Sequence, residues 1–298
     1  MRSVRVSGRL ATLVFLAGVL AVGCGGPASG AGGMLTIGDI GWTESEAVSN
    51  LTKVVLEEDL GYENVELRLV DVETLFEGVE NGELDAFQDV WTPNHREYLA
   101  GVEGGVEHLD PWYRGTTRFS VAAPDYMDIR SIGEIGSTEA TRIYGIEPGS
   151  VIMERIPDQT IPEYGLDQQL VASSTPAMLS EVGRLYHNEE DFVFVAWSPH
   201  WMNQEYDFTY LEDPKGTLGN LTEPAEISTI VRKDLREEDP AAYAFLNAMT
   251  LTEDQVNRLE LEIRDADDDP AVGARRWLED NSSVVEPWIS AAKQAREG

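Results

Sequence analysis

The sequence is poor in cysteine and in positive charge. Cys24 is the only cysteine among 298 residues, so no intramolecular disulfide bond can form and the fold depends on its hydrophobic core. There are 22 lysines and arginines against 54 aspartates and glutamates, which gives a formal net charge of −32. Such a surface repels nucleic acid and anionic lipid, and we expect neither as a partner. The acidic residues are spread along the chain and indicate a solvated surface, which leaves open whether the habitat is one of high salt.

The sequence also lacks the motifs of common catalytic and metal sites. Its four histidines, at 95, 108, 187 and 200, do not have a metal-ligand spacing such as HExxH, and neither GxSxG nor a P-loop occurs. Carboxylates are too frequent in so acidic a chain for any pair to single out an active site. We therefore expect no enzyme, no metal and no cofactor.

No apolar run is long enough to span a membrane stably, and the N-terminal run has the features of an export signal. Arg2, Arg5 and Arg9 precede the apolar residues 10–22, which is the usual order of a signal peptide. We assign residues 1–23 to this signal peptide. Residues 24–33 are mainly glycine, alanine, serine and proline, and we predict a flexible tether there.

Cys24 follows the sequence Leu-Ala-Val-Gly, which resembles a bacterial lipobox. In a lipobox the cysteine becomes the lipidated first residue of the mature protein. We therefore predict an exported protein that is anchored by lipid on the outer face of the cytoplasmic membrane. Ordinary secretion, with cleavage between Ala28 and Ala31, is the alternative.

Two similar stretches each place a tryptophan at the end of a predicted strand. Trp91 lies in VWTPNH (90–95) and Trp197 in AWSPHW (196–201), each after an apolar run. Thr or Ser is a preferred helix N-cap and Pro a preferred first helical residue, so each stretch predicts a strand that passes into a helix. Ligands of open α/β sheets bind at the carboxyl ends of the strands, so the two indoles are expected to face one crevice, one from each of two lobes. Two tryptophans buried in the core are the alternative.

A third junction of this kind surrounds Trp42. It follows the strand predicted at 34–40, and Thr43 with Glu46 fits a capping box that opens a helix. Trp42 is therefore a candidate for a third wall of the crevice, and Trp112, in an aromatic loop, is the other. His95 lies four residues after Trp91, so on a helical turn it would project near the same crevice.

The order of predicted elements favours an α/β fold with two lobes. Strands at 34–40, 65–70 and 84–90 alternate with helices that end at glycines, which predicts a largely parallel sheet. A second group of strands follows residue 119, and the strand at 226–232 is expected to return to the first lobe. Helices follow from Pro240, with Pro287 as a late helix start. We place residues 34–122 and 227–298 in one lobe and residues 123–226 in the other.

The expected crevice suits a ligand with a cation at one end and an anion at the other. Three indoles without an evident partner carboxylate favour a quaternary ammonium, which gains about 0.5 to 2 kcal/mol per aromatic face. A micromolar complex needs about 8 kcal/mol, so a second contact is required. The turn Glu-Pro-Gly-Ser at 147–150, before a predicted helix, presents backbone N–H groups suited to a carboxylate. Together with His95 this turn predicts that the ligand is a betaine.

Because of these residues, the whole mature chain resembles the glycine betaine or proline betaine substrate-binding proteins of ABC importers. The matching segments are 89–95, 145–150, 197–201 and 210–216. The resemblance implies a two-lobed periplasmic-binding-protein-like fold of type II, with a ligand cleft between the lobes and an aromatic box for the trimethylammonium group. It also implies the following roles: box walls at Trp91 and Trp197, a carboxylate partner at His95, and backbone donors at Gly149, Ser150 and Val151.

The third wall is where this chain departs from some members of the family. Those members carry an aromatic residue in the turn where Ser150 stands, whereas this chain resembles members that supply the wall from the first strand, here as Trp42. Choline, carnitine and proline betaine therefore remain alternative ligands. The implied partners are a small quaternary ammonium molecule and the subunits of an ABC permease, and we expect a monomer. An exported enzyme and a surface lipoprotein without a role in transport are the alternatives from other classes.

Overall fold

The computed structural model describes residues 32–266 and 269–298. The predicted signal peptide, Cys24 and most of the tether lie outside these residues. Gly32 and Gly33, which we had placed in the tether, belong to the first strand. Among the described residues, none of the helices combines the length and the apolar character needed to cross a membrane.

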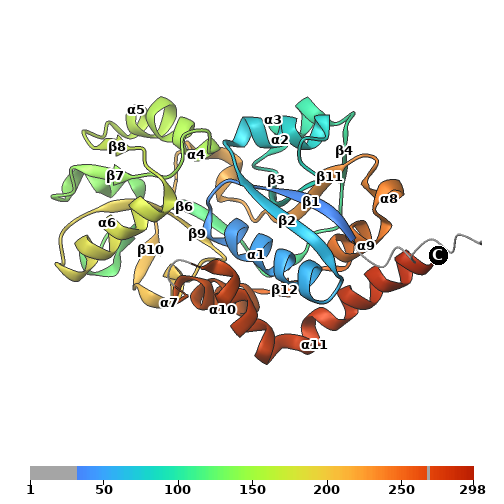
Figure 1. The fold of residues 1–298 in the computed structure, drawn as a ribbon. Coiled ribbons are helices and arrows are strands. Elements are labelled where there is room, and N and C mark those ends of the chain that lie inside the picture. Colours follow the sequence, from blue (N-terminus) through green and yellow to red (C-terminus); the bar gives the residue numbers. More distant parts are fainter. Residues whose placement is uncertain (1–31, 267–268) are drawn as a thin grey trace, which may run out of the picture. The chain divides into compact units, whose positions relative to one another are not determined.

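The first of two five-stranded sheets has the strand order β2-β1-β3-β11-β4 (Figure 1). β1 is parallel to β2 and β3, as the alternation of strands and helices predicts, whereas β11 is antiparallel to both β3 and β4. The strands are β1 Gly32–Asp39, β2 Tyr62–Leu69, β3 Ala86–Thr92, β4 Val106–His108 and β11 Glu226–Arg232. The prediction that the strand at 226–232 returns to this sheet is confirmed.

Helices from both ends of the chain accompany this sheet. They are α1 Thr43–Glu58, α2 Val72–Asn81, α3 Arg96–Val102, α8 Leu235–Glu238, α9 Pro240–Ala248, α10 Glu253–Arg264 and α11 Pro270–Glu297. α1 packs against β2, α10 and α11. The apolar side of α1 is buried, with Val48, Leu51 and Val55 fully inaccessible. Gly82 ends α2 with φ +79, a conformation that glycine adopts without a steric penalty.

The second sheet has the order β10-β6-β9-β7-β8. β9 is antiparallel to β6 and parallel to β7. The elements of this part are β6 Arg118–Pro124, β7 Arg142–Tyr144, α4 Val151–Arg155, α5 Ile161–Tyr164, β8 Gln169–Val171, α6 Thr175–His187, β9 Val193–Ser198, α7 Met202–Glu205 and β10 Phe208–Tyr210. A two-stranded sheet of β5 Tyr113–Arg114 and β12 Leu251–Thr252 lies apart from the two larger ones. The lobe boundary we placed between residues 122 and 123 falls inside β6.

The two tryptophan-bearing strands occupy similar positions in their sheets. Trp91 on β3 pairs with Ile227 of the antiparallel strand β11, and Trp197 on β9 pairs with Phe119 of the antiparallel strand β6. Both tryptophans lie at the carboxyl end of their strand, where we expected them.

The helix starts predicted at the prolines are wrong. Thr92–Pro93 and Ser198–Pro199 are cis peptide bonds, each followed by a turn, so that α3 begins only at Arg96 and α7 only at Met202. The capping box at Thr43 is also absent, because Thr43 is already helical and Trp42 is the N-cap residue. The hydroxyl of Thr43 instead hydrogen-bonds His200 Nε2 at 2.8 Å.

Pro287 does not start a helix either, since it lies inside α11. The break in this helix is at Asn281, which has φ −123 and ψ 21. The amide of Asn281 donates to the carbonyl of Trp277 at 2.8 Å. An asparagine that bonds its own helix in this way competes with the helical pattern, and the proline signal therefore misplaced the break by several residues.

Candidate functional site

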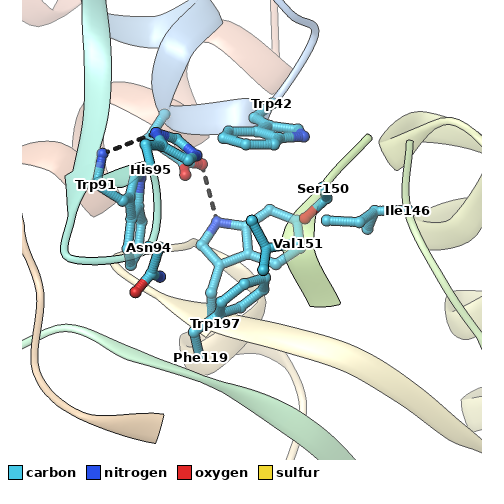
Figure 2. A pocket seen from close by; sticks show the side chains of 10 residues that line it. Trp42, Trp91, Asn94, His95, Phe119, Ile146, Ser150, Val151 and Trp197 are labelled. Atoms are coloured by element: carbon cyan, nitrogen blue, oxygen red, sulfur yellow. Dashed lines mark hydrogen bonds between the residues drawn. The ribbon is translucent and has the colours of Figure 1, made fainter. Parts of the chain in front are cut away.

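Most of the predicted site residues line one cavity between the two sheets (Figure 2). The cavity has an empty volume of about 350 Å³, which includes open solvent. This space suits a small molecule. The lining residues are Trp42, Glu44, Trp91, Asn94, His95, Phe119, Ile146, Ser150, Val151 and Trp197. Gly149 is next to this set but does not line the cavity. Trp112 lies elsewhere in the core, where its indole N–H donates to the carbonyl of Gln88 at 2.6 Å.

The indole of Trp91 is held by a carboxylate of its own strand. Its Nε1–H donates to Oδ1 of Asp89 at 2.8 Å. Side chains two residues apart project from the same face of a strand, so the β-strand geometry brings the two groups together. Asp89 is fully buried, and burial followed by the negative charge of Glu44 raises the pKa of Asp89 well above its usual range.

The indoles of Trp42 and Trp197 are held by carboxylates that come from distant parts of the chain. Trp42 Nε1–H donates to Oε2 of Glu147 at 3.0 Å, and Trp197 Nε1–H donates to Oε2 of Glu44 at 2.8 Å. Each of the three indoles therefore has a carboxylate partner on its N–H edge. We expected no such partners, and that expectation is wrong.

His95 is a neutral hydrogen-bond donor at this site. Its Nδ1 accepts the backbone N–H of Trp91 at 3.1 Å, so the ring proton is on Nε2, for which there is no partner among the described residues. Complete burial lowers the pKa of His95 to about 3, so the ring is uncharged at neutral pH. In Figure 2 the edge opposite Nδ1 faces the side of the cavity occupied by Trp42 and Trp197.

The turn before α4 contributes polar groups on the opposite side of the cavity. Gly149 has φ +100, which favours glycine at this position. The amide of Ser150 already donates to the carbonyl of Glu147 at 3.2 Å, whereas the amide of Val151 has no acceptor among the described residues. Ser150 is buried, and Figure 2 shows its side chain at the edge of the cavity. The turn thus offers the Val151 N–H and the Ser150 hydroxyl to a ligand more readily than the Ser150 N–H.

Comparison with known proteins identifies the family. The family described as the substrate binding domain of ABC-type glycine betaine transport systems matches residues 33–280. The chain belongs to this family. The glycine betaine/carnitine transport binding protein GbuC of Listeria monocytogenes serotype 1/2a (strain 10403S) is 34% identical over 164 residues, which is 54% of this chain and 53% of that protein. The match thus spans about half the length of this relative.

Solved structures of such substrate-binding domains have the same fold. Lactococcal OpuAC, in its closed conformation with glycine betaine, matches with a TM-score of 0.77 and 31% identity over 87% of this chain and 100% of that one. An ABC-transporter choline binding protein in complex with choline matches with a TM-score of 0.75 and 24% identity over 89% and 96%. The predicted family and the two-lobed α/β fold are therefore confirmed. We call the part built on the β1 sheet the first lobe and the part built on the β6 sheet the second lobe.

This substrate-binding domain carries a buried acidic group behind its indoles. Glu44 is 1% exposed, and burial followed by the charge of Glu260 raises its pKa well above the usual range. Burial raises the pKa of Glu260 to about 8, with a further contribution from Asp89, while the Trp201 N–H bonded to Oε2 of Glu260 opposes the shift. No set of three or more possible metal ligands occurs among the described residues.

Sequence reasoning missed several residues that line the site. Glu44 is two residues after Trp42 in the first helical turn, and its position next to a candidate wall was the available signal. Phe119 lies directly opposite Trp197 in the strand register, and its ring centroid is 6.1 Å from that of Trp91. Strand alternation alone does not reveal this cross-strand pairing. Asn94 lies in the VWTPNH segment, but its position one residue before His95 did not indicate that it lines the cavity.

Proposed function

We propose that the protein is an extracytoplasmic solute-binding protein that captures a small quaternary ammonium compatible solute, glycine betaine first among them, and delivers it to an ABC permease. One observation carries this proposal: the indoles of Trp42, Trp91 and Trp197 surround a small cavity whose lining also contains a carboxylate and a neutral histidine. Membership of a family of glycine betaine transport systems supports it. We propose no enzymatic activity for this site.

The ammonium end of the ligand would lie among the indoles. A quaternary ammonium has no N–H to donate, so aromatic faces bind it better than they bind a primary amine that must give up hydrogen bonds to water. Each desolvated face contributes about 0.5 to 2 kcal/mol. Glu44, which lines the same cavity, accepts the indole N–H of Trp197 and so holds one of these aromatic faces.

The carboxylate end of a betaine would lie against His95 and the turn before α4. The Nε2–H of His95, the backbone N–H of Val151 and the hydroxyl of Ser150 are the donors we assign to it. Gly149 would contribute by allowing the turn to approach the ligand closely. These contacts would supply the second part of the affinity that the aromatic box alone lacks.

Choline is the second candidate ligand, because it presents to the three indoles the same trimethylammonium group as glycine betaine. The similar protein solved with choline has the same fold, and GbuC, by its name, transports glycine betaine and carnitine. Calorimetry therefore needs to include choline and carnitine alongside the betaines.

We propose a hinge where the chain crosses between the lobes. Residues 34–122 and 227–298 would form one lobe and residues 123–226 the other, except that the first boundary moves to the start of β6. The two crossing segments are tied together just before β6 and β11. The amide of Ala225 donates to Thr117 Oγ1 at 2.6 Å, and this hydroxyl donates to the carbonyl of Ala225 at 3.0 Å. Adjacent crossings of this kind suit a bending motion that opens and closes the cleft.

We also propose that the protein is exported, anchored through a lipidated Cys24, and monomeric. Lipid on the first mature residue followed by a flexible tether would keep the binding domain close to the permease. The acidic surface makes a nucleic acid an unfavourable partner.

Isothermal titration calorimetry of the chain without its first 24 residues tests the proposed function. The panel contains glycine betaine, proline betaine, carnitine and choline, with glycine as the control that lacks the methyl groups. We expect micromolar or tighter binding of at least one quaternary ammonium compound and none of glycine. Absence of binding to the whole panel would overturn the proposal. Proton NMR of the recovered ligand checks that it is chemically unchanged, which distinguishes a binding protein from an exported enzyme.

A further inference from the structure

Two of the three indoles at the cavity are hydrogen-bonded across the cleft in a reciprocal arrangement. Trp42 precedes α1 in the first lobe and donates to Glu147, which lies in the turn before α4 of the second lobe. Trp197 on β9 of the second lobe donates to Glu44, which lies in the first turn of α1. Each lobe therefore contributes one indole and one carboxylate to the pair of contacts.

The third indole provides an internal contrast. Trp91 and its acceptor Asp89 are both on β3, so this hydrogen bond does not depend on how the lobes are arranged. The hydrogen bond on its N–H edge is made within the first lobe alone. Trp42 and Trp197, in contrast, lose their acceptors when the lobes separate.

The cross-cleft acceptors are themselves held firmly in their own lobes. Oε1 of Glu147 accepts the backbone N–H of Thr175 at 2.6 Å, and Oε2 accepts the hydroxyl of Thr175 at 2.8 Å. Glu147 is thereby fixed to the start of α6 whether or not Trp42 is present. Glu44 is carried by the first turn of α1, so its place in the first lobe is set by that helix. Each carboxylate thus belongs to an element of its own lobe.

We propose that Glu44 and Glu147 are positioning residues that orient Trp197 and Trp42 only when the lobes close, so that the aromatic box is completed by closure. This inference rests on the proposed function, because it specifies how the same site forms. A hydrogen bond on the N–H edge of an indole fixes the plane of the ring and therefore the face that it presents to a cation. The site would consequently hold its ligand mainly by slowing dissociation from the closed state.

Other contacts between the lobes do not involve the indoles of the box and provide controls. The hydroxyl of Ser198 donates to Oε1 of Glu253 at 2.9 Å, which connects β9 to the start of α10. Glu253 is therefore a carboxylate that bridges the lobes without touching Trp42, Trp91 or Trp197. Glu253→Ala measures what the loss of a cross-lobe carboxylate does by itself.

The first test is the dissociation rate of glycine betaine from the full mature protein, measured by stopped-flow tryptophan fluorescence. Removing a hydrogen bond to a charged group corresponds to a change of about tenfold, so Glu147→Ala should raise the dissociation rate by about that factor with little change in the association rate. Glu147→Gln retains an acceptor oxygen and should recover part of this loss. Glycine betaine should dissociate from Glu253→Ala at nearly the wild-type rate. A Glu147→Ala protein that releases glycine betaine as slowly as Glu253→Ala would overturn the inference.

The second test follows hydrogen exchange at the indole N–H groups of the wild-type protein by NMR. The chain has seven tryptophans, so seven indole signals are expected, and Trp→Phe variants assign them. Without ligand, the Trp42 and Trp197 signals should exchange faster than that of Trp112, which is bonded within the first lobe. Glycine betaine should slow the first two and leave Trp112 unchanged. Equal exchange of all three without ligand contradicts the inference.

The outcomes separate the inference from the proposed function. If the wild-type protein binds none of the quaternary ammonium compounds, the proposed function is wrong. If it binds glycine betaine but Glu147→Ala and Glu253→Ala behave alike, the binding function stands and the positioning role of Glu147 is wrong.

Discussion

The imidazole of His95 stacks on the indole of Trp42, with ring centroids 5.7 Å apart and an angle of 26° between the planes. Phe76 packs against the same imidazole edge to face, with centroids 5.6 Å apart. The backbone N–H of Trp91 bonds to Nδ1 of His95 at 3.1 Å. His95 is therefore fixed on several sides, which leaves its Nε2–H as the group available to a ligand.

Replacing His95 by phenylalanine should separate ligands by their anionic end. The aromatic ring of His95→Phe can still pack against Trp42 and Phe76, but it has no N–H to donate. We expect glycine betaine to bind about tenfold more weakly, because a donor to a charged carboxylate is lost, while choline is affected less. Calorimetry with both ligands measures the difference. His95→Phe also removes the acceptor of the Trp91 amide, and this change affects the binding of both ligands alike. Equal losses of affinity for the two ligands would therefore show that the carboxylate is held elsewhere, at Val151 or Ser150.

Much of the fold was predictable because local patterns determine it. The strand β11 was predicted with its observed bounds, and α2 ends at Gly82 as its glycine indicated. The positions of Trp91 and Trp197 at strand ends followed from apolar runs that stop at a polar motif. These features depend on a few consecutive residues, so the sequence alone carries enough information.

The chemistry around the indoles was not predictable in the same way. Trp42 and Glu147 are 105 residues apart, and Trp197 and Glu44 are 153 apart. In a chain with 54 acidic residues, no local pattern marks the two that face an indole. Their roles follow only from the packing of one lobe against the other. The capping box at Thr43 failed for a related reason, since Thr43 bonds a histidine of the second lobe instead of capping its own helix.

Truncating Trp197 should affect ligand binding more than the stability of the ligand-free protein. Trp197→Ala removes an aromatic face and its buried area, which corresponds to about 1 to 3 kcal/mol of binding free energy. Trp197 is 3% exposed, but part of that burial comes from contacts that open with the cleft. The control is Trp112→Ala, which truncates a ring that is 1% exposed within the first lobe and should cost about 3 to 5 kcal/mol of unfolding free energy. Calorimetry and urea unfolding measure the two quantities, and similar destabilisation by both variants would assign Trp197 to the core.

Replacing Cys24 by alanine should release the protein from the membrane without changing its affinity. The lipid would attach through this side chain, and the predicted tether separates it from the folded domain, which begins with β1. Fractionation of cells that express Cys24→Ala should move the protein from the membrane fraction to the soluble one. Calorimetry on the released protein provides the control for ligand binding. Retention of the variant in the membrane fraction would contradict lipidation at Cys24.

The buried carboxyl group of Glu260 should make the protein less stable as the pH rises. Its pKa is raised to about 8 by burial, against an ordinary value of 4.5 in the unfolded chain. Between these values the folded protein binds more protons than the unfolded one, so the unfolding free energy falls as pH increases. His95 and His200 act in the opposite direction, because burial lowers the pKa of each to about 3, and their contribution is lost as pH falls below about 6.5.

These opposing effects leave about pH 7 to 8 as the window in which Glu260 can be measured with both histidines mainly neutral in either state. Glu260→Gln removes one titrating proton but keeps an oxygen that can accept the Trp201 N–H. The unfolding free energy of the wild-type protein should therefore fall more steeply than that of Glu260→Gln, by up to about 1.4 kcal/mol per pH unit, the value for one proton. Glu44 and Asp89, whose pKa values are also raised, keep a residual slope in the variant. Urea unfolding at several pH values measures both curves, and parallel curves would mean that Glu260 is ionised in the folded protein despite its burial.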